Sequence, residues 1–164
     1  MPQARTYTRL QITLHWLIAA LILIQLTVNT DMQQAFAQRL ATGAIPENAG
    51  AIFHATIGIA VLFLALLRLG LRFWHGVPEP EGNNSALVAF LSLATHWLLY
   101  GFMFLMPVTG AVAWFFGIEL AGVVHELGRL VLIPAILLHV AGAVIEELVL
   151  NNRVVGKMLR SRAR

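Results

Sequence analysis

Four long apolar segments, separated by polar or turn-forming stretches, most constrain how this chain can fold. A helix rises about 1.5 Å per residue, so about 20 apolar residues cross a hydrocarbon core of about 30 Å. With 59% hydrophobic and 12% charged residues and a mean hydropathy of +0.77, the chain has too few polar side chains to cover a soluble domain. We therefore expect an all-α membrane protein, a four-transmembrane-helix bundle forming one domain over 1–164. The expected helices span about 10–29, 51–72, 86–116 and 124–150.

The positive residues indicate the orientation of these helices. Nine of the eleven Lys and Arg residues lie at one side of such a bundle: Arg5, Arg9, Arg68, Arg72, Arg153, Lys157, Arg160, Arg162 and Arg164. Positive residues are retained in the cytoplasm, so both termini should be cytoplasmic. The connections 29–50, with a short surface helix, and 117–124 then face outward. This topology explains the net charge of +3 without nucleic acid, and we expect 73–85 to be a loop containing a solvated His75.

The histidines of the apolar segments fall into two depth layers. His125 and His139 are 14 residues apart, which is about four turns, so both project from one helical face roughly 21 Å apart along the axis. Counting along the other segments places His54 at the depth of His125, and His15 and His96 at the depth of His139. Ionisable residues inside spanning helices are costly and mark functional sites.

Paired imidazoles at two depths of a bundle suit two six-coordinate haems, because neutral imidazole is a good iron ligand. Small residues on the faces of these histidines would leave room for a flat macrocycle: Gly58, Gly128 and Gly142. The absence of cysteine excludes thiolate-bound clusters and CxxCH haem attachment, and makes bare zinc or copper less suitable. The competing interpretation is hydrogen-bonded packing or a proton relay without a cofactor, as in a transporter or proton channel.

Two arginines are candidates for the haem propionates. Arg68 follows His54 by 14 residues, so it shares that face at the depth of the inner layer. There it could pair with inner propionates, or simply anchor the positive-inside end. Arg129 lies one turn after His125 and also needs a partner inside the membrane. The candidate partners are an outer propionate, Glu126 and the headgroup layer.

Four segments together resemble the bacterial cytochrome b561 family, and the resemblance covers nearly the whole chain. They are YTRLQITLHWL at 7–17, the His54-x3-Gly58 segment running to LLRLGLRF at 66–73, HWLLYGFMFLMPVTG at 96–110 and HELGRLVLIPAILLHVAGAV at 125–144. The His15–His54 and His125–His139 intervals also resemble those in the cytochrome b subunits of formate dehydrogenases and nickel–iron hydrogenases.

The resemblance implies two non-covalent haem b groups in a multi-pass protein of the bacterial inner membrane. It implies an outer haem iron on His54 and His125 and an inner one on His15 and His139, with ubiquinone as acceptor. His96 is then a quinone-site or proton-transfer candidate, or orients a propionate or a ligand. The similarity of LQITLHWL at 10–17 to LSLATHWL at 91–98 supports an alternative, in which His15 pairs with His96.

One branch of the family is a superoxide oxidase, which passes electrons from periplasmic superoxide to ubiquinone. This chain departs from that branch in its short outer connection and few outer cations, and it has Glu146 and Glu147 where relatives often have a histidine pair. The two acids can carry quinone-linked protons or pair with tail arginines.

We therefore expect a quinone-linked oxidoreductase embedded in membrane lipid, with a periplasmic-side donor for which superoxide is a candidate. The first alternative is the membrane-anchor subunit of a multi-subunit dehydrogenase or hydrogenase, working with a peripheral redox subunit. The second is the non-redox transporter or proton channel.

Overall fold

The computed structural model describes residues 7–28, 31–78 and 85–159, and within these ranges it is all helix, turn and irregular chain, with no strand. Its helices are α1 (Arg9–Thr27), α2 (Met32–Thr42), α3 (Ala49–His75), α4 (Ala86–Phe116), α5 (Glu119–Leu148) and α6 (Val154–Leu159). Four of them, α1, α3, α4 and α5, are long and apolar enough to cross a membrane, which confirms the expected fold class. The cations Arg5, Arg160, Arg162 and Arg164, and loop residues 79–84, lie outside the described residues.

The outer surface of the four long helices is apolar. Leu23, Phe63 and Leu130 are 62%, 63% and 60% exposed, and many other large apolar side chains also face outward. Such a surface would drive aggregation in water, but it matches the hydrocarbon core of a bilayer, where helices satisfy all their backbone hydrogen bonds internally.

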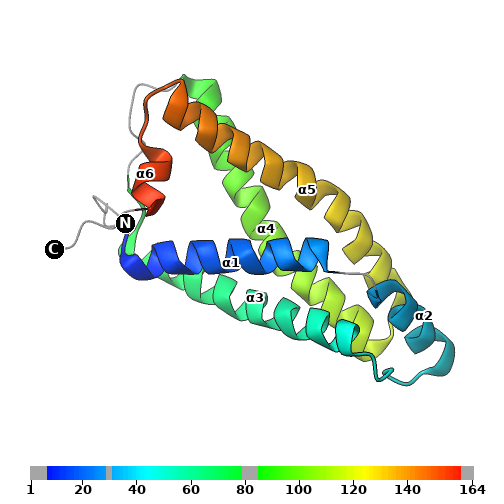
Figure 1. Cartoon of the computed structure of the whole chain (residues 1–164). Helices are drawn as coiled ribbons and strands as arrows, with labels where there is room; N and C mark the ends of the chain where they lie inside the picture. The colour runs from blue at the N-terminus through cyan, green and yellow to red at the C-terminus, as the bar shows by residue number, and fades with distance from the viewer. Residues whose placement is uncertain (1–6, 29–30, 79–84, 160–164) are drawn as a thin grey trace.

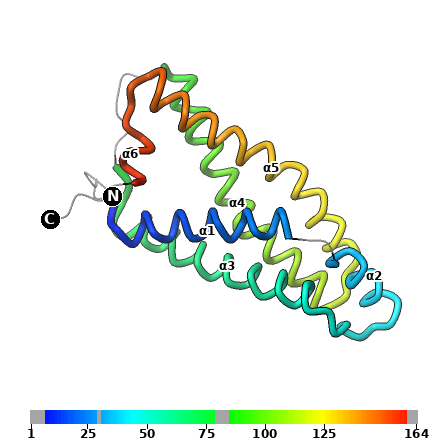
Figure 2. Tube along the Cα trace, in the orientation of Figure 1, coloured from blue at the N-terminus to red at the C-terminus, as the bar shows by residue number. Residues whose placement is uncertain are grey.

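The long helices pack in the order α1, α3, α4, α5, each against the next (Figure 1). In contrast, α1 and α3 make almost no close backbone contact with α5. The Cα trace shows α5 diverging from α1 towards the end of the bundle that carries α6, while α2 lies at the opposite end (Figure 2). Side chains that reach from α1 or α3 to α5 therefore cross the interior of the bundle.

At the α6 end, the start of α1 is tied to the end of α3. Thr8 and Gln11 form a capping box that satisfies the first backbone amides of α1. The Gln11 side-chain amide also donates to the carbonyl of Gly76 at 3.1 Å, and the Gln11 carbonyl accepts from Arg68 Nη1 at 2.7 Å. These bonds bring the cations at the start of α1 and the end of α3 to one side of the bundle.

At the opposite end, α2 folds onto the bundle, and the short helix expected in the first connection is confirmed. Ala35 of α2, Ala51 of α3 and Trp114 of α4 form a small buried core. Arg39 of α2 donates to the carbonyls of Trp114 and Phe115 at 3.3 and 3.2 Å. A guanidinium at these unpaired carbonyls caps the C-terminus of α4 and complements its dipole.

Two helix boundaries differ clearly from the sequence expectation, and one helix was not expected. Helix α3 extends to His75, where a loop was expected, and ends at Gly76 with φ +70; His75 is exposed, as expected. Helix α5 starts at Glu119, because Gly117 ends α4 with φ +66 and the extended Ile118 starts the next helix at once. The connection is therefore far shorter than 117–124. Helix α6 was not expected.

Candidate functional site

The structure brings His54 of α3 and His125 of α5 together across the interior. Their ring centroids are 6.2 Å apart and the ring planes are inclined by 72°. Two imidazoles that bind one iron from opposite sides have centroids about 6 Å apart, because each metal–nitrogen bond is about 2 Å long and the ring centre lies about 1 Å further on. The observed separation fits such a pair.

The His125 ring is fixed by the backbone of α4. Its Nδ1 lies 2.8 Å from the Met106 carbonyl, and the Thr109 hydroxyl is 3.4 Å away. Because a carbonyl only accepts, Nδ1 carries the proton, and Nε2 is the nitrogen with a lone pair for a metal. Gly110 allows this approach, since a Cβ there would lie 3.0 Å from two atoms of the His125 ring. The sequence pattern did not identify Gly110 as part of the site.

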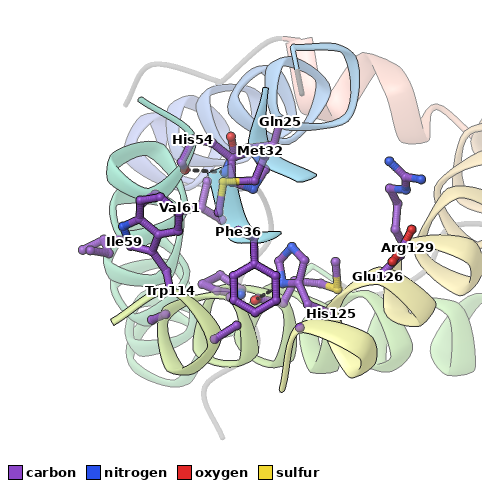
Figure 3. Close-up of a pocket in the computed structure, with 18 of the residues that line it drawn as sticks. Gln25, Met32, Phe36, His54, Ile59, Val61, Trp114, His125, Glu126 and Arg129 are labelled. Carbon is purple, nitrogen blue, oxygen red and sulfur yellow. Dashed lines mark hydrogen bonds between the residues drawn. The ribbon is translucent and has the colours of Figure 1, made fainter. Parts of the chain in front are cut away.

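Both histidines line a cavity that side chains of α1 to α5 enclose (Figure 3). Its walls are mostly apolar, and Met32 and Phe36 of α2 contribute to them. Phe36 packs closely on Gly122 of α5, where a Cβ would lie 2.5 Å from the ring. Helix α2 thus closes the end of the cavity.

Gln25 of α1 reaches the same cavity. Its Nε2 donates to the His54 backbone carbonyl at 2.9 Å. Its Oε1 and the His54 Nδ1 are both buried, and neither has a hydrogen-bond partner among the described residues. Within the described part of the chain, the cavity therefore contains one amide oxygen and one imidazole nitrogen that still need a hydrogen-bond partner.

The second cluster joins the other three intramembrane histidines. His15 of α1 and His139 of α5 have ring centroids 6.1 Å apart, again with steeply inclined planes at 70°. His96 of α4 packs edge-on against His139 at 5.0 Å, and its Nδ1 donates to the Ser92 carbonyl at 2.6 Å. The His15–His139 separation matches the distance of about 6 Å for two ligands on one iron, whereas the His96–His139 separation is shorter. The exposed His96 is a neighbour of this pair.

The expected small residues contribute unequally. A Cβ at Gly128 would lie 2.7 Å from the sulfur of Met106, so Gly128 serves the packing of α5 on α4. A Cβ at Gly142 would meet nothing within 4 Å, and one at Gly58 would meet only the Gln25 amide at 3.4 Å. Room beside the histidines comes chiefly from the separation of α1 and α3 from α5.

The two candidate arginines differ in their partners. Arg68 is half-buried and uses one of its five N–H groups on the Gln11 carbonyl. Arg129 lines the outer cavity and has no hydrogen-bond or ion-pair partner within the described ranges. Burial raises the pKa of Tyr7, just before α1, although the guanidinium groups of Arg68 and Arg72 lower it. The Tyr7 hydroxyl is therefore a neutral donor at physiological pH.

The two acids at the end of α5 hold the segment that follows it. Asn152 donates to the backbone and side chain of Glu146 at 2.8 and 3.3 Å. Glu147 accepts from the amides of Val155 and Gly156 at 2.9 and 3.5 Å. In addition, Trp16 Nε1 of α1 donates to the Met158 carbonyl at 2.8 Å. These bonds fix α6 across the open end between α1 and α5.

The residues present fit haem better than a bare metal ion. Each site offers two imidazoles from helices that hardly touch, so a flat group can lie between them. The walls around His54 and His125 are mostly apolar, and the tautomer of His125 is set by a backbone carbonyl. These are the features with which helix bundles hold bis-histidine haem.

Comparisons with known proteins agree with this chemistry. A sequence model of the family described as prokaryotic cytochrome b561 matches residues 6–161. The chain is 36% identical over 162 residues to a cytochrome b562 of Cereibacter sphaeroides. The alignment covers 99% of this chain and 100% of the relative. It is 26% identical over 106 residues to a probable superoxide oxidase CybB of Yersinia pestis, covering 65% of this chain and 56% of that protein.

The matched residues include all four spanning helices, which indicates a multi-pass protein of the bacterial inner membrane. The family implies haem b, a cofactor for which the histidine pairs are suitable ligands. The chain therefore belongs to the prokaryotic cytochrome b561 family of membrane electron-transfer proteins.

Proposed function

We propose that the chain binds two haem b groups and moves electrons across the membrane between a periplasmic-side donor and the quinone pool. His54 and His125 hold the outer haem, and His15 and His139 hold the inner one. The observation that carries this proposal is the pair of ring separations, 6.2 and 6.1 Å, each between helices that make almost no close backbone contact. His125 and His139 lie 14 residues apart on α5, so the two sites are roughly 21 Å apart along the bundle.

The haems supply one-electron chemistry, and the protein supplies ligands, orientation and charge. The Met106 carbonyl orients His125 and keeps its Nδ1 protonated. Arg129 is the partner of the outer propionates, because it lines that cavity and has no other hydrogen-bond partner among the described residues. Arg68, for which the described residues provide a single hydrogen-bond partner, the Gln11 carbonyl, takes the inner propionates.

We assign the quinone site to the end of the bundle that holds the inner pair, His15 and His139. The cations of the described chain that lie at its end of the bundle, such as Arg9, Arg72 and Lys157, support a cytoplasmic orientation. His96 is exposed next to His139, and its Nδ1–H is already bound to the Ser92 carbonyl. Its Nε2 is therefore an acceptor for a quinol hydroxyl, and we assign it to the quinone site.

The donor side has two candidates. The name of the Yersinia pestis relative supports superoxide. The described charges at the α2 end favour a donor with a basic surface, such as a peripheral redox subunit, because acids exceed bases there and an anion gains from a positive surface. The acids are Asp31, Glu47, Glu119 and Glu126; the bases are Arg129 and Arg39, and Arg39 is bound to the end of α4.

The test is a haem assay on protein purified in detergent, followed by rapid mixing of the oxidised protein with donors. We expect two haem b per chain with low-spin spectra, and reduction by a soluble ubiquinol. Reduction by superoxide, abolished by superoxide dismutase, would identify that donor; no reduction by superoxide would favour the peripheral subunit. A colourless protein that does not take up haem would contradict the proposal and favour a non-redox role.

A further inference from the structure

The outer ligand His54 has a polar atom that requires a partner. A histidine that binds iron through Nε2 carries its proton on Nδ1, and metal-bound histidines almost always donate that proton to an acceptor. In this structure the His54 Nδ1 is buried and has no hydrogen-bond partner among the described residues. Leaving such a donor unsatisfied in the protein interior is unfavourable, so an acceptor is expected next to it.

Gln25 offers the matching acceptor. Its amide nitrogen is bound to the backbone carbonyl of His54 itself, so the side chain is held beside this residue. Its Oε1 is the other buried side-chain atom without a partner in the part of the chain that the structure describes. Gly58, one turn after His54, keeps the space next to the Gln25 amide open, since a Cβ there would lie 3.4 Å from Nε2.

We propose that Gln25 is the positioning residue of His54, with its Oε1 accepting the Nδ1–H directly or through one buried water. A buried donor and a buried acceptor without partners among the described residues, on two residues that are already joined by one hydrogen bond, are the groups that such a water requires. The arrangement parallels His125, whose Nδ1–H is bound to the Met106 carbonyl. This inference rests on the proposed ligation of the outer haem by His54.

The bond has a consequence for the outer haem. An imidazole whose N–H is bound to an acceptor is a more basic ligand, and such a ligand stabilises the oxidised iron. Gln25 therefore lowers the reduction potential of the outer haem. Because Gln25 lies on the outer pair only, the potential of the inner haem is an internal reference.

The experiment is a redox titration of Gln25→Met, which keeps a similar unbranched volume but has no acceptor oxygen at its end. We expect both haems to be retained and the outer potential to rise, with a change of up to about tenfold in the reduced-to-oxidised ratio at a fixed potential, or about 59 mV for one electron. The inner potential should not move. Gln25→Leu gives the same measurement if the Met variant does not accumulate.

Two further variants separate the hydrogen bond from packing. Gln25→Glu retains an acceptor oxygen in either protonation state, so the outer potential should return to the wild-type value or fall below it. Gln34→Leu changes an exposed amide of α2 that does not line the cavity, and should leave both potentials unchanged.

The outcomes distinguish this inference from the proposed function. Two haems with an unaltered outer potential in Gln25→Met would overturn the role of Gln25 and leave the haem assignment standing. An inner potential that rises with the outer one would show a general structural change and also overturn it. If His54→Ala keeps both haems, the ligand assignment itself fails.

Discussion

The two histidine pairs have nearly the same ring separation but different surroundings. At the outer pair, His125 is fixed by a backbone carbonyl, an amide side chain lies beside His54, and α2 closes the cavity. At the inner pair, His139 packs against the exposed imidazole of His96. The comparison teaches that the same ring separation can occur in two different surroundings: one pair has fixed hydrogen-bond partners beneath α2, and the other lies beside an exposed imidazole.

The largest predicted effect comes from filling the space that His125 occupies. In Gly110→Val, the new side chain meets the His125 ring, because even a Cβ would lie 3.0 Å from it. Overpacking of this kind costs about 1–3 kcal/mol, which weakens haem binding about tenfold or more. We expect the haem-to-protein ratio to fall towards one, with the inner haem kept.

The matched control is Gly101→Val on the same helix, where a Cβ meets nothing within 4 Å. Its two haems should remain. Equal haem loss in both variants would attribute the effect to α4 as a whole and would remove the distinction between the outer and inner sites.

The second largest predicted effect concerns His96, the imidazole next to the inner pair. His96→Ala should retain both haems, because His15 and His139 already form a pair at the separation of two ligands on one iron. The rate of reduction by ubiquinol should fall about tenfold, because the free energy of one hydrogen bond to the substrate corresponds to about that factor. Rapid-mixing kinetics measure this rate, and loss of a haem would instead support the pairing of His15 with His96.

A smaller effect concerns the closure of the outer cavity. Phe36→Ala removes the ring that packs on Gly122, which costs about 1–2 kcal/mol for a half-buried side chain. Reduction of the outer haem by dithionite should accelerate while both haems remain. Gln38→Ala, an exposed position on the same helix, serves as the control; an equal acceleration there would show that α2 does not close the cavity.

The smallest effect concerns the attachment of α6. Trp16→Phe removes the bond to the Met158 carbonyl, which contributes about 1 kcal/mol. We expect faster proteolysis after residue 150 and unchanged haem content. Trp74→Phe, at a position that is 81% exposed, should leave the rate of proteolysis unaltered.

The spans and the two layers were predictable because they depend on local periodicity. Long apolar runs gave the four helices, and the 14-residue interval on α5 placed two histidines on one face. The connection before α5 was predicted too long, because the short turn at Gly117 and Ile118 depends on a left-handed residue within an apolar stretch.

The partners of the ligands were not predictable in the same way. The Met106 carbonyl is a backbone atom, and its place beside His125 depends on how α4 packs against α5. Gln25 did give a signal, since an amide inside a spanning segment needs a partner, but the sequence alone does not say which one. The assignment of the four ligands remains a prediction that the observed ring separations support.

Haem quantification in single ligand variants tests the two-site assignment most directly. His54→Ala and His125→Ala should each lose the same haem, and His15→Ala and His139→Ala the other, leaving about one haem per chain in every case. His75→Ala, at an exposed position on α3, should keep two. Loss of both haems in all four variants, or retention of both in any one of them, would contradict two independent bis-histidine sites.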